Sequence, residues 1–155
     1  MKLATALTER ADLQRRLSEL ETRLNNNAKI QEGEQPAEDP TSLLAELDGI
    51  VLRLEELIAA INLTNSTTMS DGRTLTELLA HRDCVKQRLQ IMRSFLDNAS
   101  RKIDRYSRTE IRIESTVSVS DLQKDVDRIS KELREVDEKI QELNWTTELK
   151  ESETA

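Results

Sequence analysis

The chain has 155 residues, of which 34% are charged and 2% are aromatic, and its 30 acidic and 23 basic side chains give a formal charge of -7. Its three glycines and two prolines make a composition typical of long helices rather than of β-sandwiches or barrels. The single cysteine, Cys84, excludes an intramolecular disulfide framework. Apolar runs such as 57–61 fall far below the ~18 residues that cross a membrane, so we expect a cytoplasmic protein without a membrane segment.

The first expected element is a helix over about residues 2–25, where apolar positions step alternately by three and four residues. This heptad pattern is typical of coiled coils. Its positions are Leu3, Ala6, Arg10, Leu13, Leu17, Leu20 and Leu24. The period is lost over 26–39, which include Gly33 and Pro36, so this stretch is predicted to be a connector.

A second helix is expected over about 40–63. Asp39 before Pro40 supplies a side-chain acceptor for the helix N-terminus, followed by a residue whose missing N–H costs nothing at the first helical position. Its apolar positions are doubled, as Leu43/Leu44, Ile50/Val51 and Leu57/Ile58. Doubling widens the apolar stripe, which indicates that this helix contacts more than one neighbour.

A third helix is expected over about 75–105. It follows the polar run 62–73, which contains the turn dipeptide Asp71-Gly72. Thr74 with Glu77 three residues later forms a capping box, the pattern of a helix start. Heptad-spaced apolar positions then continue through the segment, which indicates another coiled-coil-like helix.

A fourth helix is expected over about 121–144, behind a capping box of Ser120 and Gln123. Between the third and fourth helices, β-branched residues alternate with polar ones, so 109–119 is predicted to be extended. An unpaired strand needs a partner. We therefore expect it to form a short ribbon with 28–32, or to pair with its own copy across a two-fold axis.

The expected fold class is mainly all-α, with four long antiparallel helices in a bundle or coiled-coil-like arrangement and one domain over 1–155. The charge is uneven: segment 30–60 carries -7 (one basic, eight acidic), 81–112 carries +5 (nine and four), and 121–155 carries -5 (six and eleven). This order favours electrostatic pairing of the third helix with its neighbours. A narrow seam together with the widened stripe of the second helix predicts a homo-oligomer.

Candidate sites for chemistry are few. Glu77, His81 and Cys84 share one face of the third helix, but the chain has a single histidine, so we expect no metal site and no cofactor. Cys84 lies in mid-helix without the N-terminal dipole that activates thiolates, and phosphate-loop and nucleophile-elbow motifs are absent from the sequence. We therefore expect a protein that is not an enzyme.

A basic cluster surrounds Tyr106 and includes Arg101 and Lys102. The candidate anion contacts in it are Arg105, Arg108 and Arg112. Acidic residues interleave with this cluster, which favours internal pairing over binding of nucleic acid. The candidate subunit contacts are Ile111, Ile113 and Trp145, the last because a large amphipathic ring suits a helix end or an interface.

The sequence resembles a family of small uncharacterised bacterial proteins, some of which carry the name septicolysin. The resemblance covers nearly the whole chain and is carried by residues 2–4, 9–14, 27–40, 71–76, 104–108 and 142–149. It brings no catalytic or binding residues, but the name implies a pore-forming cytolysin, for which 109–119 is the segment suited to insertion.

These observations favour a self-associating structural or protein-interaction protein. The alternative is a membrane-active, septicolysin-like oligomer. A third interpretation is a binder of an anionic ligand or nucleic acid through the arginine-rich segment 101–112.

Overall fold

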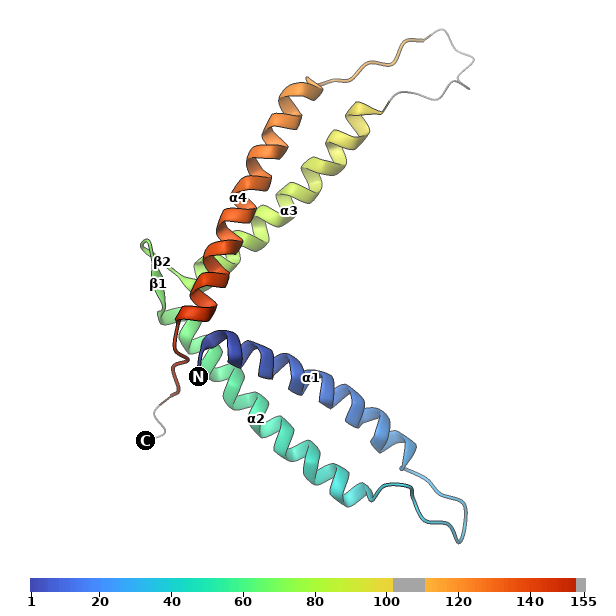
Figure 1. Ribbon diagram of the computed structural model, residues 1–155. Coiled ribbons are helices and arrows are strands. Elements are labelled where there is room, and N and C mark those ends of the chain that lie inside the picture. The colour runs from blue at the N-terminus through green and yellow to red at the C-terminus, as the bar shows by residue number, and fades with distance from the viewer. Residues whose placement is uncertain (102–110, 153–155) are drawn as a thin grey trace. The chain divides into compact units, whose positions relative to one another are not determined.

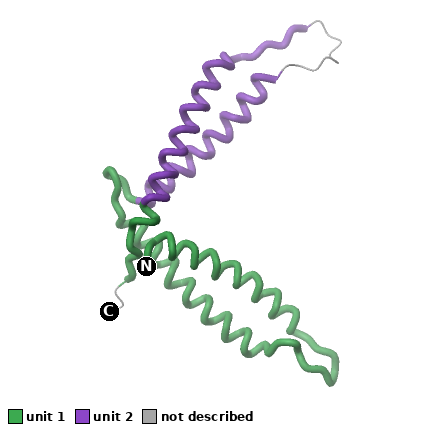
Figure 2. Tube along the Cα trace, in the orientation of Figure 1, with its two compact units in different colours: residues 1–74, 143–155 green, residues 75–142 purple. Residues whose placement is uncertain are grey.

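The computed structural model of the chain describes residues 1–101 and 111–152. Within these ranges the chain forms four long helices and one two-stranded antiparallel sheet, so the predicted mainly all-α fold class is confirmed (Figure 1). The elements are α1 (Leu3–Asn26), α2 (Pro40–Thr67), β1 (Met69–Ser70), β2 (Arg73–Thr74), α3 (Leu75–Ser100) and α4 (Val119–Thr146). The chain divides into two compact units: unit 1 comprises residues 1–74 and 143–155, and unit 2 comprises residues 75–142 (Figure 2).

Unit 1 is built on a hairpin in which α1 and α2 lie side by side (Figure 1). The two helices bury the side chains that the heptad spacing selects, because these positions repeat on one face of each helix. The buried positions include Leu3, Ala6, Leu13 and Leu20 on α1 and Leu43, Ile50, Leu57 and Ile61 on α2. The helix expected over 2–25 is therefore confirmed to within one residue at each end.

The start of α2 follows the sequence prediction. Asp39 Oδ1 accepts a hydrogen bond from the N–H of Thr41 at 3.1 Å, and Asp39 Oδ2 accepts one from the hydroxyl of Ser42 at 3.1 Å. Pro40 occupies the first turn, where its missing N–H loses no helical partner. The helix runs on to Thr67, beyond the expected end at 63, and the hydroxyl of Thr67 caps a carbonyl of its last turn at 2.8 Å.

The predicted connector 26–39 is confirmed, and side chains close it. Asn27 is buried, and its Nδ2 donates to the carbonyl of Arg23 at 2.8 Å. Its Oδ1 accepts from the N–H of Glu38 at 2.9 Å. Arg23 also forms a two-pronged pair with the carboxylate of Glu38, with Nη2 2.7 Å from Oε1 and Nε 3.1 Å from Oε2. These contacts bring the two ends of the connector together.

The C-terminal tail of unit 1 pairs with the beginning of the chain. The N–H of Leu3 donates to the carbonyl of Thr147 at 2.9 Å, and the N–H of Leu149 donates to the carbonyl of Met1 at 2.8 Å. This is a short antiparallel bridge of backbone hydrogen bonds outside the named strands. It satisfies the backbone N–H of Leu3, at the start of α1, which has no partner inside the helix.

Side chains add to this attachment. Lys2 Nζ lies 2.6 Å from Glu148 Oε1, and the hydrogen bond from Lys2 lowers the pKa of the Glu148 carboxyl. The tail then reaches α2, where the N–H of Lys150 donates to the hydroxyl of Thr64 at 2.8 Å. Thr64 is fully buried, and its hydroxyl in turn donates to the carbonyl of Ala60 at 2.7 Å. The tail is therefore tied to both helices of unit 1.

The small sheet lies between α2 and α3, where β1 pairs with β2 around the turn Asp71-Gly72. Both turn residues have positive φ, 51° and 80°, a combination that favours Asp-Gly in two-residue hairpin turns. The turn at this dipeptide is confirmed. The prediction that the β element lies between the third and fourth helices is wrong for the described residues, because the spacing of side chains cannot report which extended segments pair.

Unit 2 is a second hairpin, formed by α3 and α4. Its apolar cluster contains Val85 and Leu89 of α3 and Val126 and Ile129 of α4, with Met92, Leu96 and Leu133 packed against it. Polar contacts also join the two helices: His81 Nε2 lies 3.2 Å from Glu132 Oε1, and Arg82 Nη1 lies 3.8 Å from Asp137 Oδ1. The predicted electrostatic pairing of the third helix with the fourth is thus present, and its predicted pairing with the second helix stays a prediction.

The ends of these helices differ from the predictions. α3 begins directly after Thr74, as expected, but ends at Ser100, and most of the remaining expected range lies outside the described residues. α4 begins at Val119 rather than 121, because Ser118 and not Ser120 caps it. The Ser118 hydroxyl accepts the N–H of Asp121 at 3.3 Å, and the Ser118 carbonyl accepts the N–H of Leu122 at 3.0 Å.

The ribbon expected between 109–119 and 28–32 is not present in the part of the chain that the structure describes. Residues 28–32 and 111–118 are neither helix nor strand there, and 119 opens α4. Residues 109 and 110 lie outside the described ranges. A polar cap at Ser118 starts the helix and ends the alternating stretch early. Pairing across a two-fold axis stays a prediction.

Candidate functional site

The outer side of α2 is apolar and open to solvent. Its five large aliphatic side chains that face outward are Leu44, Val51, Leu52, Ile58 and Leu63, between 36% and 60% exposed. Three of them, Leu44, Val51 and Ile58, follow one another at intervals of seven residues and so form a row along the helix. The doubled positions of the sequence predicted this second surface. We call these five residues, together with Asp48 and Glu55, the α2 face.

Two acidic residues divide this face. At about 100° of rotation per residue, Asp48 and Glu55 fall between the row of Leu44, Val51 and Ile58 and the side occupied by Leu52 and Leu63. Both carboxylates are exposed, and no basic side chain of residues 1–101 or 111–152 lies within 4 Å of either. The α2 face therefore presents aliphatic surface with unneutralised negative charge.

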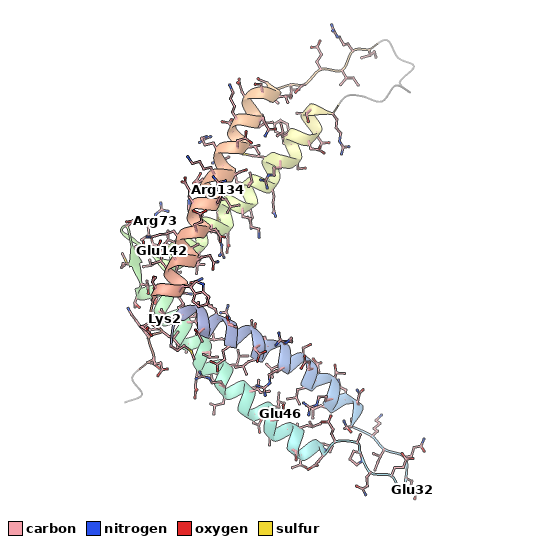
Figure 3. The ribbon with its side chains drawn as sticks, viewed as in Figure 1. Lys2, Glu32, Glu46, Arg73, Arg134 and Glu142 are labelled. Carbon is pink, nitrogen blue, oxygen red and sulfur yellow. The ribbon has the colours of Figure 1, made fainter. Side chains whose placement is uncertain are left out.

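The one basic residue of α2, Arg53, is turned away from these acids and bound to α1. Its Nε donates to Glu9 Oε1 at 2.7 Å and its Nη2 donates to Glu9 Oε2 at 3.1 Å. The hydrogen bond between them lowers the pKa of the Glu9 carboxyl and raises the pKa of the Arg53 guanidinium. Glu46, labelled in Figure 3, similarly lies 3.8 Å from Arg16 and 3.6 Å from Arg23. These pairs fix the register of the hairpin and leave the α2 face free.

A shallow hollow of about 310 Å³ adjoins this face, where the C-terminal tail passes α2. Its lining residues are Arg53, Glu56, Leu57, Ala59, Ala60, Leu149, Glu151 and Ser152. Arg53 already binds Glu9, so the hollow offers no unpaired cation to an acidic ligand. Its small apolar walls extend the α2 face rather than form a pocket with chemistry of its own.

The candidate anion contacts are only partly covered by the described residues. Arg105 and Arg108 lie outside them. Arg112 is exposed, and its Nε lies 4.0 Å from Glu114 Oε1. Arg101, at the other edge of the cluster, lies 3.1 Å from Asp97. The described arginines of this cluster thus each face a carboxylate of their own neighbourhood, and anion binding by the segment stays a prediction.

The candidate subunit contacts all lie on the surface. Ile111 and Ile113 are 75% and 65% exposed on the stretch before α4, and Trp145 is 64% exposed in the last turn of α4. Trp145 therefore does not fill a helix end within the described chain. Ile111 and Ile113 belong to unit 2, and Trp145 belongs to unit 1. Their contact with a second subunit stays a prediction.

The residues weighed for metal binding, Glu77, His81 and Cys84, lie on α3. His81 Nε2 pairs with Glu132, and Cys84 is exposed. Across residues 1–101 and 111–152, no three His, Cys, Asp or Glu side chains are grouped to hold a metal ion. The same ranges contain no helix whose apolar stretch could cross a bilayer.

Comparison with known proteins gives a family and a fold but no activity. The family model DUF6847, described as a family of unknown function, matches residues 10–149. A crystal structure described as that of a functionally unknown conserved protein from Corynebacterium diphtheriae is 42% identical in sequence, with a TM-score of 0.87, covering 97% of this chain and 99% of that one. No curated protein matches the sequence. These comparisons lend no support to the name septicolysin.

Proposed function

Because the chain belongs to DUF6847, a family of unknown function, we propose a function from its surface: a non-enzymatic protein that self-associates through the α2 face. The observation that carries the proposal is the exposure of Leu44, Val51 and Ile58 at heptad spacing on a helix that already packs on α1 with its other side. Contiguous exposed apolar residues on a soluble domain mark protein contacts. The proposal includes a cytoplasmic location, which suits a lone free cysteine.

A second copy of the chain is the partner that this surface suits. Apolar residues at positions flanking a heptad seam are typical of helices that pack in bundles of three or more rather than in pairs. α1 covers one side of α2 through the buried seam, and a further helix would cover the other side. Every copy of the chain brings long heptad-patterned helices, so self-association supplies that further helix.

The apolar area of the α2 face sets the expected free energy of association. Full burial of a Leu, Ile or Val contributes about 1.5–3 kcal/mol, so covering five side chains that are already about half covered contributes about 5 kcal/mol. Association costs about 4–15 kcal/mol in lost translational and rotational freedom. Apolar contact at one α2 face therefore supports weak association by itself, and stable assembly needs further contacts.

Sedimentation velocity across the micromolar range tests the proposal. We expect the wild-type chain to sediment above the mass of a single chain, and Val51→Glu to shift the protein toward the monomer because it places a charge in the apolar row. Ile91→Glu on α3 is the matched control, since Ile91 is also exposed but lies outside the α2 face. A wild-type chain that remains a monomer, or equal dissociation of both variants, would contradict the proposal.

A second candidate, membrane activity, rests on a different observation. Ile111 and Ile113 are more exposed than any other large apolar residues of the described chain apart from Ile91, and they lie on a segment without helix or strand. Release of an enclosed dye from anionic and neutral liposomes by the purified protein would support this function. No release at all would exclude this function, and equal release by wild type and by Ile111→Ser/Ile113→Ser would exclude the two isoleucines as its basis.

A further inference from the structure

Unit 2 has an open groove between α3 and α4. The hollow measures about 500 Å³ and is lined by Arg82, Asp83, Lys86, Leu89 and Arg93 of α3 and by Ser130, Leu133, Arg134 and Asp137 of α4. Leu89, a buried member of the apolar cluster of the hairpin, and Leu133, which packs against that cluster and is partly buried, lie among the charged side chains of the groove. We call this hollow the basic groove.

The groove carries unneutralised positive charge. Arg82 engages both of its acidic residues, with Nη2 3.2 Å from Asp83 Oδ1 and Nη1 3.8 Å from Asp137 Oδ1. Lys86 and Arg134 have no carboxylate within 4 Å among the residues that the structure describes. The same holds for Arg93, whose Nη2 donates to the hydroxyl of Ser130 at 3.1 Å.

The spacing of these charges matches the α2 face. Lys86 and Arg93 are seven residues apart on α3, and Asp48 and Glu55 are seven residues apart on α2. At 1.5 Å per residue, both pairs span about 10.5 Å along their helices. Arg134 adds a third positive charge from the α4 side of the groove (Figure 3). Two helices with charges at the same interval can form both ion pairs in one register.

We propose that the basic groove of one molecule receives the α2 face of a second copy. The incoming α2 helix lies along α3 and α4 as the third helix of a bundle, with Asp48 and Glu55 opposite Lys86 and Arg93. Its aliphatic row packs against Leu133, the partly buried leucine of the groove. This inference rests on the proposed function and names the surface that the α2 face contacts.

The α2 face of one copy could contact either the basic groove or the α2 face of a second copy, and charge favours the groove. Pairing of two α2 faces would place the Asp48 and Glu55 carboxylates of both copies in one interface, and facing like charges oppose association. The basic groove offers opposite charges to the same carboxylates, and the partly buried Leu133 to the same aliphatic row. Because each copy has one face and one groove, the contact is heterologous, and it extends until the copies close on one another.

Paired charge reversals test the inference. The groove variant is Lys86→Glu/Arg93→Glu, and the face variant is Asp48→Lys/Glu55→Lys; all four side chains are exposed, so we expect both variants to fold, as circular dichroism would verify. Each variant alone should associate about a hundredfold more weakly than wild type, because like charges then face each other. An equimolar mixture should associate again, since each groove then meets a face of opposite charge. The matched control, Arg88→Glu/Lys124→Glu, makes the same change in net charge outside the groove and should associate like wild type.

The outcomes separate this inference from the proposed function. A wild-type monomer overturns both. Dissociation by Val51→Glu without dissociation by the groove variant keeps the proposed function and overturns the groove as its partner, because that pattern belongs to pairing between two α2 faces. Added salt gives a second measurement: screening should weaken the association proposed here, whereas association strengthened by salt would also overturn it.

Discussion

α1 and α2, of 24 and 28 residues, form one helical hairpin, and α3 and α4, of 26 and 28 residues, form the other, but the described ends of the two hairpins differ. In unit 1, Asn27 and Arg23 close the connector and the C-terminal tail binds the opposite end. In unit 2, the described part of the connection, 111–118, is exposed and without secondary structure. Heptad spacing therefore underlies the buried seams of both hairpins, whereas particular side-chain and backbone contacts close the ends of the unit 1 hairpin.

The hairpins also differ in what they expose. Unit 1 presents aliphatic side chains and unpaired carboxylates on α2. Unit 2 presents a groove whose basic side chains outnumber the acidic ones. The net charge of the chain hides this division, because an acidic face and a basic groove largely cancel in the sum. The proposed association between copies uses these opposite surfaces of the two units.

The largest expected loss of stability comes from truncating a buried side chain in either core, and the two cores can be tested separately. Ile129→Ala in unit 2 and Leu57→Ala in unit 1 each remove a side chain that is almost fully buried, and each should lower the free energy of unfolding by about 2–5 kcal/mol. If the hairpins unfold separately, hydrogen exchange should accelerate in α3 and α4 for the first variant and in α1 and α2 for the second. Faster exchange throughout both units in either variant would show that the hairpins unfold together, as one domain.

A smaller effect is expected at the connector of unit 1. Asn27→Ala removes both hydrogen bonds of a buried side chain and leaves the Glu38 N–H and the Arg23 carbonyl without that partner. Unfolding in urea should show a loss of about 1–3 kcal/mol, with faster exchange in the connector. Asn26→Ala is the matched control, because Asn26 is exposed. Equal losses in both variants would mean that the connector is not held by Asn27.

The attachment of the C-terminal tail should contribute less to the free energy of unfolding than Asn27 does. Thr64→Val keeps the shape of the side chain but removes the acceptor for the N–H of Lys150 and the donor to Ala60. Because Lys150 is exposed and water can replace the lost acceptor, we expect a loss of about 1 kcal/mol in thermal or urea unfolding. Exchange at the amide of Lys150 should accelerate. Unchanged exchange there would contradict a role of Thr64 in holding the tail.

These contacts also mark the limit of what the sequence predicts. Spacing and capping residues locate four helices and the turn at Asp71-Gly72, because those signals are local. The Asn27–Glu38 bond joins residues 11 apart, and the Thr64–Lys150 bond joins residues 86 apart, so no periodicity reports them. The doubled apolar positions of α2 predict a second apolar surface on this helix, which is the α2 face. The sequence does not predict the basic groove in the same way, because the groove depends on which sides of α3 and α4 meet. The seven-residue interval between Lys86 and Arg93 can be counted in the sequence, but the interval alone does not indicate a groove.

Acid should act on unit 1 through three carboxyl groups. Hydrogen bonds from Arg53, Arg23 and Lys2 lower the pKa values of Glu9, Glu38 and Glu148, respectively, from the ordinary value of 4.5. A carboxyl group with a lowered folded-state pKa stabilises the fold above its unfolded-state pKa, and this contribution is lost as the pH falls through the folded-state value.

Stability should therefore be retained above about pH 4.5 and decline below it. Because these pairs are exposed, the effect of each should be small, and the measurement has to compare variants. Urea unfolding between neutral and acidic pH should show a smaller acid-dependent loss for Glu38→Gln than for wild type, since the amide does not titrate. Glu21→Gln is the control, because Glu21 is exposed on α1 and forms no ion pair with the described residues. If Glu38→Gln and Glu21→Gln follow the same pH profile as wild type, the Arg23–Glu38 pair does not contribute to closing the connector in solution.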